Sequence, residues 1–157
     1  MVPGFLQGAH AAVPDLSEVA AEPQEYSGFN LLVGEIGANG SLYYYSNRGG
    51  EARKLAPGIY GLSNHLLDTP WPKVANGKAA FAAAISDGAF AAEDLFGILA
   101  DETLAPDDQL PATGVSYEAE KAISAIFIKT PGYGTRCSNL LTFDSGYKWN
   151  FDERVFV

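Results

Sequence analysis

The segment from Pro57 to Pro72 constrains the fold of this chain more than any other. A β-prone run that starts at Ile59 ends in the polar tripeptide Ser63 to His65. The prolines on either side of Trp71 lack a backbone N–H and have a fixed φ, so a sheet cannot continue through them. The sequence therefore predicts a strand that delivers polar side chains into a shaped loop, as in the wall of a binding site.

The predicted elements follow the order β-rich, helical, β-rich. The β-prone runs are 29–34, 41–47, 53–55 and 59–63, then 124–129, 138–144 and 147–151, and the helical runs are 14–22, 73–85, 93–100 and 117–122. Helices that stand between antiparallel hairpins are typical of an α+β fold, with the helices packed on a sheet face. A chain of 157 residues is long enough for one hydrophobic core, so residues 1–157 are expected to form a single domain.

Charge and cysteine content narrow the classes of function. The chain carries ten basic and nineteen acidic residues, a formal charge of -9, and has no basic stripe, which argues against nucleic-acid binding. No apolar run is long enough to span a membrane. The single cysteine, Cys137, excludes an internal disulfide and a cysteine-based metal site. We therefore expect a cytoplasmic protein without a metal or other cofactor.

Asn64 is the first candidate for chemistry. Its amide offers two N–H donors and no titratable charge, which suits stabilisation of an oxyanion during acyl transfer. The alternative is an asparagine that hydrogen-bonds a turn. Ser63 and His65 would face away from Asn64 if the strand continued, and His65 is either a general base or a loop residue.

The second candidate is the glycine-rich stretch from Pro131 to Ser138. Its glycines allow a ligand to approach the backbone closely. Arg136 at the start of the next strand could direct its guanidinium group into a cleft. The stretch does not match a phosphate-binding loop. The alternative is a glycine-rich turn with a surface arginine in a salt bridge.

These segments resemble the Asn-Arg-Asp-Glu (NRDE) family, also called the transport-and-Golgi-organization-2-like family. The matching runs are Tyr26 to Leu32, Tyr43 to Arg48, Tyr60 to Pro72 and Pro131 to Arg136. They occur in the order of the family and cover nearly the whole chain.

The resemblance implies an N-terminal-nucleophile-hydrolase-like αββα sandwich, in which two antiparallel sheets lie between helical layers. In related amidohydrolases an N-terminal Cys attacks an amide carbonyl, and an Asn amide stabilises the oxyanion. Asn64 and Arg136 stand where that Asn and a late active-site Arg fall, so both are predicted to be catalytic. The residues predicted to contact substrate are Ser63, His65, Trp71 and Tyr133.

The start of the chain departs from the family pattern. Family members begin with Met-Cys followed by the Asn-Arg-Asp-Glu signature, whereas this chain begins Met1-Val2-Pro3. We therefore expect the C-terminal portion of the family domain, N-terminally incomplete and without hydrolase activity as written. Absent first strands would expose sheet edges, so self-association through those edges is expected.

Three functions remain open at this point. The first is an amidohydrolase-like family member that binds a small acyl or amide ligand between its sheets. The second is a non-catalytic trafficking factor or small-molecule carrier, because eukaryotic members of the family are associated with Golgi organisation, secretion and haem or lipid handling. The third is an inert fragment.

Overall fold

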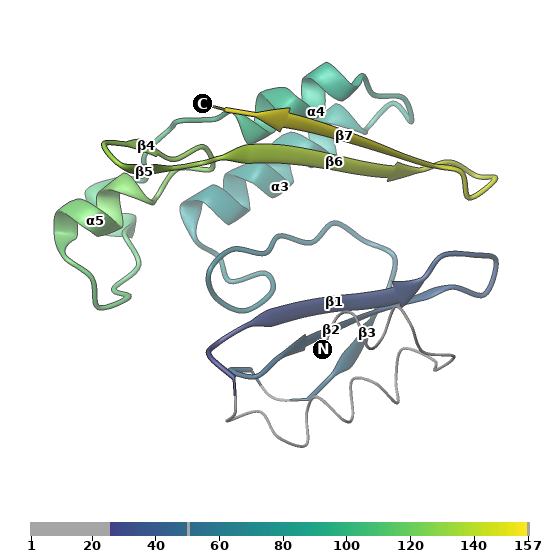
Figure 1. The fold of residues 1–157 in the computed structure, drawn as a ribbon, viewed down its shortest axis with the longest axis horizontal. Coiled ribbons are helices and arrows are strands. Elements are labelled where there is room, and N and C mark those ends of the chain that lie inside the picture. Colours follow the sequence, from purple (N-terminus) through teal and green to yellow (C-terminus); the bar gives the residue numbers. More distant parts are fainter. Residues whose placement is uncertain (1–25, 50, 157) are drawn as a thin grey trace. The chain divides into compact units, whose positions relative to one another are not determined.

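The computed structural model describes residues 26–49 and 51–156, which fall into two compact units (Figure 1). The first unit contains the described residues up to Gly58 together with Asn64–Leu67. The second contains Ile59–Ser63 and the described residues from Asp68 onward. The helix predicted at 14–22 lies outside the described residues.

The first unit is a three-stranded antiparallel sheet in the order β1-β2-β3. Its strands are β1 (Asn30–Glu35), β2 (Ser41–Ser46) and β3 (Arg53–Leu55). Val33 of β1 is buried with Tyr45 of β2, and Phe29 packs against Tyr45 edge to face at 5.9 Å between ring centroids. The predicted hairpin and third strand are thus confirmed: Val33 and Tyr45 lie on one face of the sheet, whereas the buried Tyr44 lies on the other.

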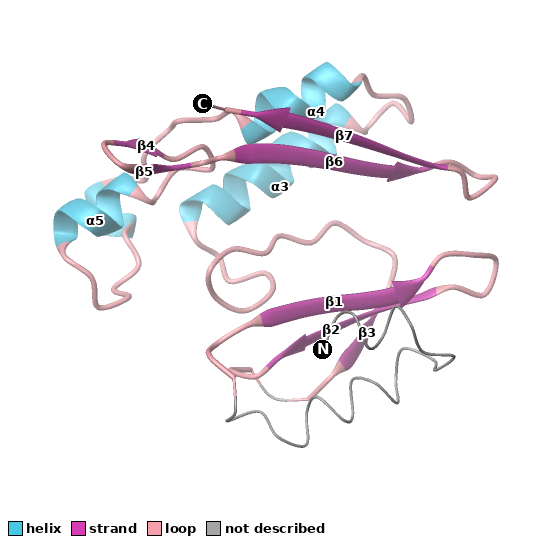
Figure 2. Ribbon diagram, viewed as in Figure 1, coloured by secondary structure: helices cyan, strands magenta, loops and turns pink. Residues whose placement is uncertain are grey.

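The second unit combines helices with two hairpins. Its helices are α3 (Pro72–Ala84), α4 (Ala92–Leu99) and α5 (Tyr117–Ala122), with a 3-10 turn η2 (Asp107–Gln109). Its hairpins pair β4 (Lys129–Thr130) with β5 (Tyr133–Gly134), and β6 (Cys137–Phe143) with β7 (Trp149–Val155). Helices α3 and α4 lie on one side of the β6–β7 hairpin (Figure 2). The fold is therefore of the α+β class, while the αββα sandwich stays a prediction.

Side chains from α4 join the helices to this hairpin. Leu95 and Phe96 of α4 are buried, and the Arg154 guanidinium of β7 lies 3.8 Å from the centre of the Phe96 ring. Arg154 also pairs with Glu93 of α4. Apolar burial and a stacked cation together fix the helix on the strands.

The predictions of two strands are wrong. Backbone groups that would pair in a sheet form hydrogen bonds with other residues instead. Residues 59–63 are irregular: the Gly61 carbonyl accepts from Asp68 N at 2.7 Å instead of joining a strand. Residues 124–127 form bends, and Phe127 N donates to the Asp101 carbonyl at 2.8 Å. The last strand begins at Trp149, two residues later than predicted, because the turn before it holds Tyr147 at a φ of 61°.

Among the described residues, no helix combines the length and apolarity needed to cross a membrane.

Candidate functional site

The predicted site wall is a closed loop between Gly61 and Asp68. Asp68 N donates to the Gly61 carbonyl at 2.7 Å, and Gly61 N donates back to Asp68 Oδ1 at 2.8 Å. Lys78 Nζ of α3 lies 2.6 Å from the same carboxylate oxygen. Asp68 adopts a φ of 61°, a conformation that Asp tolerates better than most residues. One carboxylate therefore joins both ends of the loop to helix α3.

Residues 64–67 of this loop belong to the first unit, where Tyr44 holds them. The Tyr44 hydroxyl donates to Asn30 Oδ1 at 2.6 Å and accepts from Leu67 N at 3.0 Å. Asn30 Nδ2 in turn donates to the His65 carbonyl at 3.0 Å. Tyr44 and Leu67 are buried, whereas Asn64 is exposed. Within the first unit, the backbone that follows Asn64 is thus held at His65 and Leu67.

Ser63 and Trp71, which flank these residues, belong to the second unit. Both are half-buried. The Trp71 carbonyl accepts the first amides of α3, from Val74 and Ala75, and Lys73 Nζ lies 5.8 Å from the centre of the Trp71 ring. Trp71 therefore has a clear role in starting helix α3, since Pro72 at the first helical position needs no amide partner.

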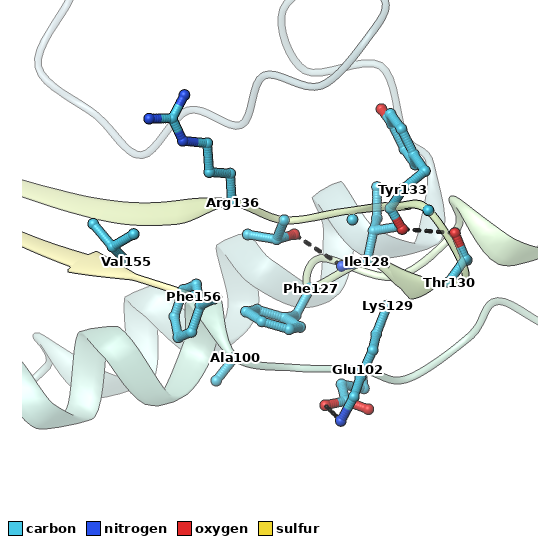
Figure 3. Close-up of a pocket in the computed structure, with 13 residues that line it drawn as sticks. Ala100, Glu102, Phe127, Ile128, Lys129, Thr130, Tyr133, Arg136, Val155 and Phe156 are labelled. Carbon is cyan, nitrogen blue, oxygen red and sulfur yellow. Dashed lines mark hydrogen bonds and ion pairs between the residues drawn. The ribbon is translucent and has the colours of Figure 1, made fainter.

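A cleft of about 810 Å³ lies at the β4–β5 hairpin (Figure 3). The hairpin turns at Pro131–Gly132, where Gly132 has a φ of 79° that favours glycine. Thr135 N donates to the Ile128 carbonyl, and Ile128 N donates to Thr135 Oγ1 at 2.9 Å. The glycine-rich stretch thus forms a rigid frame for the cleft.

Aromatic and aliphatic side chains form one wall of this cleft. The Phe127 and Phe156 rings meet edge to face at 4.8 Å, beside Val155 and Ala100. Lys129 and Glu102 also line the cleft as an exposed ion pair, with 3.6 Å between Nζ and Oε1. The cleft is therefore apolar along this wall and charged at one end.

Arg136 and Tyr133 both line this cleft. Their side chains extend to one side of the hairpin, whereas the two phenylalanines lie on the other side (Figure 3). The Arg136 carbonyl accepts from Phe156 N at 2.8 Å, which fixes the backbone at this position. Within the described residues no salt bridge of the Arg136 guanidinium is found, and a role of Arg136 in a site stays a prediction.

The structure brings together Arg136 and Tyr133, and separately Asn64 and His65. Asn64 belongs to the first unit and Arg136 to the second, so their convergence on one site stays a prediction.

Comparison with known proteins gives the family of the chain. The family model described as Transport and Golgi organisation 2 matches residues 1–157. The chain belongs to this family. It is 36% identical to the cattle Transport and Golgi organization protein 2 homolog, 33% to the human homolog and 30% to the mouse homolog. Each match covers the whole chain and 61% of the relative's length.

For this member of the Transport and Golgi organisation 2 family, sequence reasoning missed the residues that hold the site. Phe127 and Phe156 are far apart in the chain, and neither lies in a recognisable motif. The contacts of the Tyr44 hydroxyl with Asn30 and Leu67 could not be foreseen, because the three residues are far apart in the chain. Asp68 gave one usable signal, because Asp is favoured both in turns and at positive φ. No cluster of three or more potential metal ligands occurs within residues 26–49 and 51–156.

Proposed function

We propose that this chain acts in transport and Golgi organisation as a non-catalytic protein that carries a small acyl or lipid-like molecule. The names of its relatives support the process, and the apolar wall of the cleft supports the cargo. The protein works in the cytoplasm, a compartment that suits a chain with a single cysteine.

The contact of Phe127 with Phe156 is the observation that carries this function. The two rings, with Val155 and Ile128, provide an apolar surface in an open cleft large enough for a small ligand. Burying an aliphatic chain there would gain about 25 cal/mol for each Å² removed from water. The Lys129–Glu102 pair lies on the side of the phenylalanines and offers polar contacts for the head group of the ligand, whereas the Arg136 side chain extends to the other side of the hairpin.

Titration with a dansyl-labelled fatty acid tests this function. The wild-type protein should enhance the dansyl fluorescence with saturation, and Phe156→Leu should weaken the affinity by about fivefold or more through lost aromatic contact. Phe90→Leu is the matched control, because Phe90 is exposed and does not line the cleft. Circular dichroism verifies that both variants fold.

Haem is the other cargo that a family member could carry, and a shift of the Soret band on mixing would reveal it. Absence of saturable binding by both probes, or equal affinities of Phe156→Leu and wild type for the fatty acid, would rule out carriage in this cleft.

Amidohydrolase chemistry on an αββα sandwich is the second candidate function. The pinned loop from Gly61 to Asp68 favours it, because a fixed backbone presents the exposed Asn64 amide as an oxyanion donor would require. Cys137 lies within strand β6 and is half-buried, which does not suit it as the attacking group.

A release assay with acyl p-nitroanilides tests the amidohydrolase function in a form of the protein that carries the Met-Cys start of the family, because Cys137 does not suit the role of nucleophile. If Asn64 stabilises the oxyanion, Asn64→Ala should lower kcat by about 10²- to 10³-fold. Asn139→Ala serves as a control on the β6–β7 hairpin. No turnover by the form with the Met-Cys start would leave the carrier as the function of these residues.

A further inference from the structure

A groove of about 420 Å³ separates helices α3 and α4, apart from the cleft at β4–β5. Small residues from both helices line it: Gly77 and Ala80 on α3, and Gly97 on α4. Asn76, Ile98 and Ile126 add to its lining, and two carboxylates, Asp94 and Asp101, complete it. Most of the side chains that line the groove are therefore small or apolar, and the charged groups among them are both acidic.

The surface of α3 is unusual for a helix in contact with water. After Lys78 its residues are only alanine and Phe81, and residues 79–83 are all exposed. A solvated helix normally carries charged residues on its outer face, whereas an apolar face normally packs against another element. The helix thus presents an apolar surface beside the groove.

The charge of the groove indicates what can pack there. Asp94 Oδ2 accepts from Ala91 N at 3.2 Å, and Asp101 Oδ1 accepts from Thr103 N at 2.9 Å. The hydrogen bonds from Thr103 lower the pKa of Asp101, so its carboxylate stays ionised. No lysine or arginine of the described residues lines the groove. The two lysines of α3 are engaged elsewhere, Lys73 with the Ile123 carbonyl and Lys78 with Asp68.

We infer that the α3–α4 groove binds an amphipathic helix of a partner protein, with lysine or arginine beside a narrow apolar face. The small side chains of Gly77, Ala80 and Gly97 let the backbone of a third helix approach the groove closely. The two carboxylates face the basic side chains of that helix, which sets its position along the groove. This inference does not depend on the ligand of the β4–β5 cleft.

A labelled synthetic peptide tests the groove without knowledge of the natural partner. The probe is an 18-residue amphipathic helix of leucine, alanine and lysine, with a matched peptide in which glutamate replaces lysine. Fluorescence anisotropy should show saturable binding of the lysine peptide and none of the glutamate peptide. Amide shifts in an NMR titration should concentrate in α3 and α4.

Gly97→Leu is the decisive variant. A Cβ at Gly97 would meet no atom within 4 Å, so the first atom of the new side chain has open space at the groove. Circular dichroism verifies that the variant folds. We expect it to weaken peptide binding at least tenfold with no change in net charge. Ala112→Leu, on an exposed loop residue outside the groove, should leave the affinity unchanged.

Asp94→Asn and Asp101→Asn test the charges, since asparagine keeps an acceptor for Ala91 N and Thr103 N. Each should weaken binding by about fivefold or less, as expected for exposed ion pairs, and the difference should shrink at high salt. Asp108→Asn removes the same charge outside the groove and should have no effect.

Three results would overturn the inference. One is a lysine peptide that fails to bind at low salt. Another is equal binding to wild type and Gly97→Leu, which would indicate only general attraction to an acidic chain. The third is a wild-type dimer that Gly97→Leu converts to monomers, which would assign the groove to a second copy.

Discussion

Glu120 is the buried carboxylate on which the loop around Thr113 depends. Its side chain is 6% exposed and accepts from Thr113 N at 3.0 Å and from Thr113 Oγ1 at 2.7 Å. Glu120→Ala leaves both donors without this acceptor and should lower the free energy of unfolding by about 2–3 kcal/mol. Glu120→Gln keeps an acceptor oxygen and should lower the free energy of unfolding by less than Glu120→Ala does. Urea denaturation measures both, and the exposed Glu118→Ala on the same helix should change stability by less than about 0.5 kcal/mol.

Lys73 links stability to alkaline pH. Burial lowers the pKa of Lys73 below its ordinary value of 10.5, an effect that nearby Glu120 partly offsets. Between the lowered folded pKa and 10.5 the unfolded chain binds more protons, so the Lys73 contribution to stability rises with pH through that window. We expect the difference in unfolding free energy, wild type minus Lys73→Met, to increase toward pH 10.5. Lys54→Met, at an exposed strand position, is the control. A Lys73→Met difference in unfolding free energy that does not change with pH would contradict the assignment.

At the scale of elements, the loop that carries Asn64 depends on the Tyr44 hydroxyl. Tyr44→Phe removes the acceptor of Leu67 N and the donor to Asn30 Oδ1. The free energy of unfolding should fall by about 1–2 kcal/mol, because Leu67 N then loses a buried partner. Hydrogen exchange at Leu67 should accelerate, while exchange in β6 and β7 stays as in wild type. Equal protection of Leu67 in both proteins would show that the loop is held by other contacts.

The elements that the sequence predicted correctly have local signals. Strands β1 and β2 are runs of β-prone residues on either side of a turn, and Pro72 marks the start of α3. The two strand predictions that are wrong fall on the β-prone segments 59–63 and 124–129. There the backbone hydrogen-bonds to residues outside the segment, Gly61 to Asp68 and Phe127 to Asp101. Tertiary context overrides propensity in both segments.

The same distinction applies to the candidate site. Arg136 and Tyr133 could be assigned to a cleft because a Pro-Gly turn beside them marks a hairpin. The apolar wall could not be foreseen, since Phe127 and Phe156 come together only through the packing of separate hairpins. The local Pro-Gly pattern thus indicated where the β4–β5 hairpin of the cleft lies. The apolar character of the cleft depends on contacts between distant segments.

For the whole molecule, the open sheet edges predict self-association. Within the part of the chain that the structure describes, no third strand pairs with β6 or β7. The hairpin also exposes Leu141, Trp149 and Phe151, with Trp149 70% exposed. Unpaired edges beside apolar side chains favour pairing with another chain.

Sedimentation velocity over a concentration series should therefore show reversible association of the wild-type chain. Phe151→Lys places a charge on β7, where it disfavours edge pairing, and should shift the protein toward the monomer at equal concentration. Ala112→Lys adds the same charge on an exposed loop and separates the effect of the strand from that of net charge. If both variants dissociate equally, the association arises from overall charge and not from the β6–β7 edge. A monomer at every concentration of wild type would mean that these strands are protected in solution.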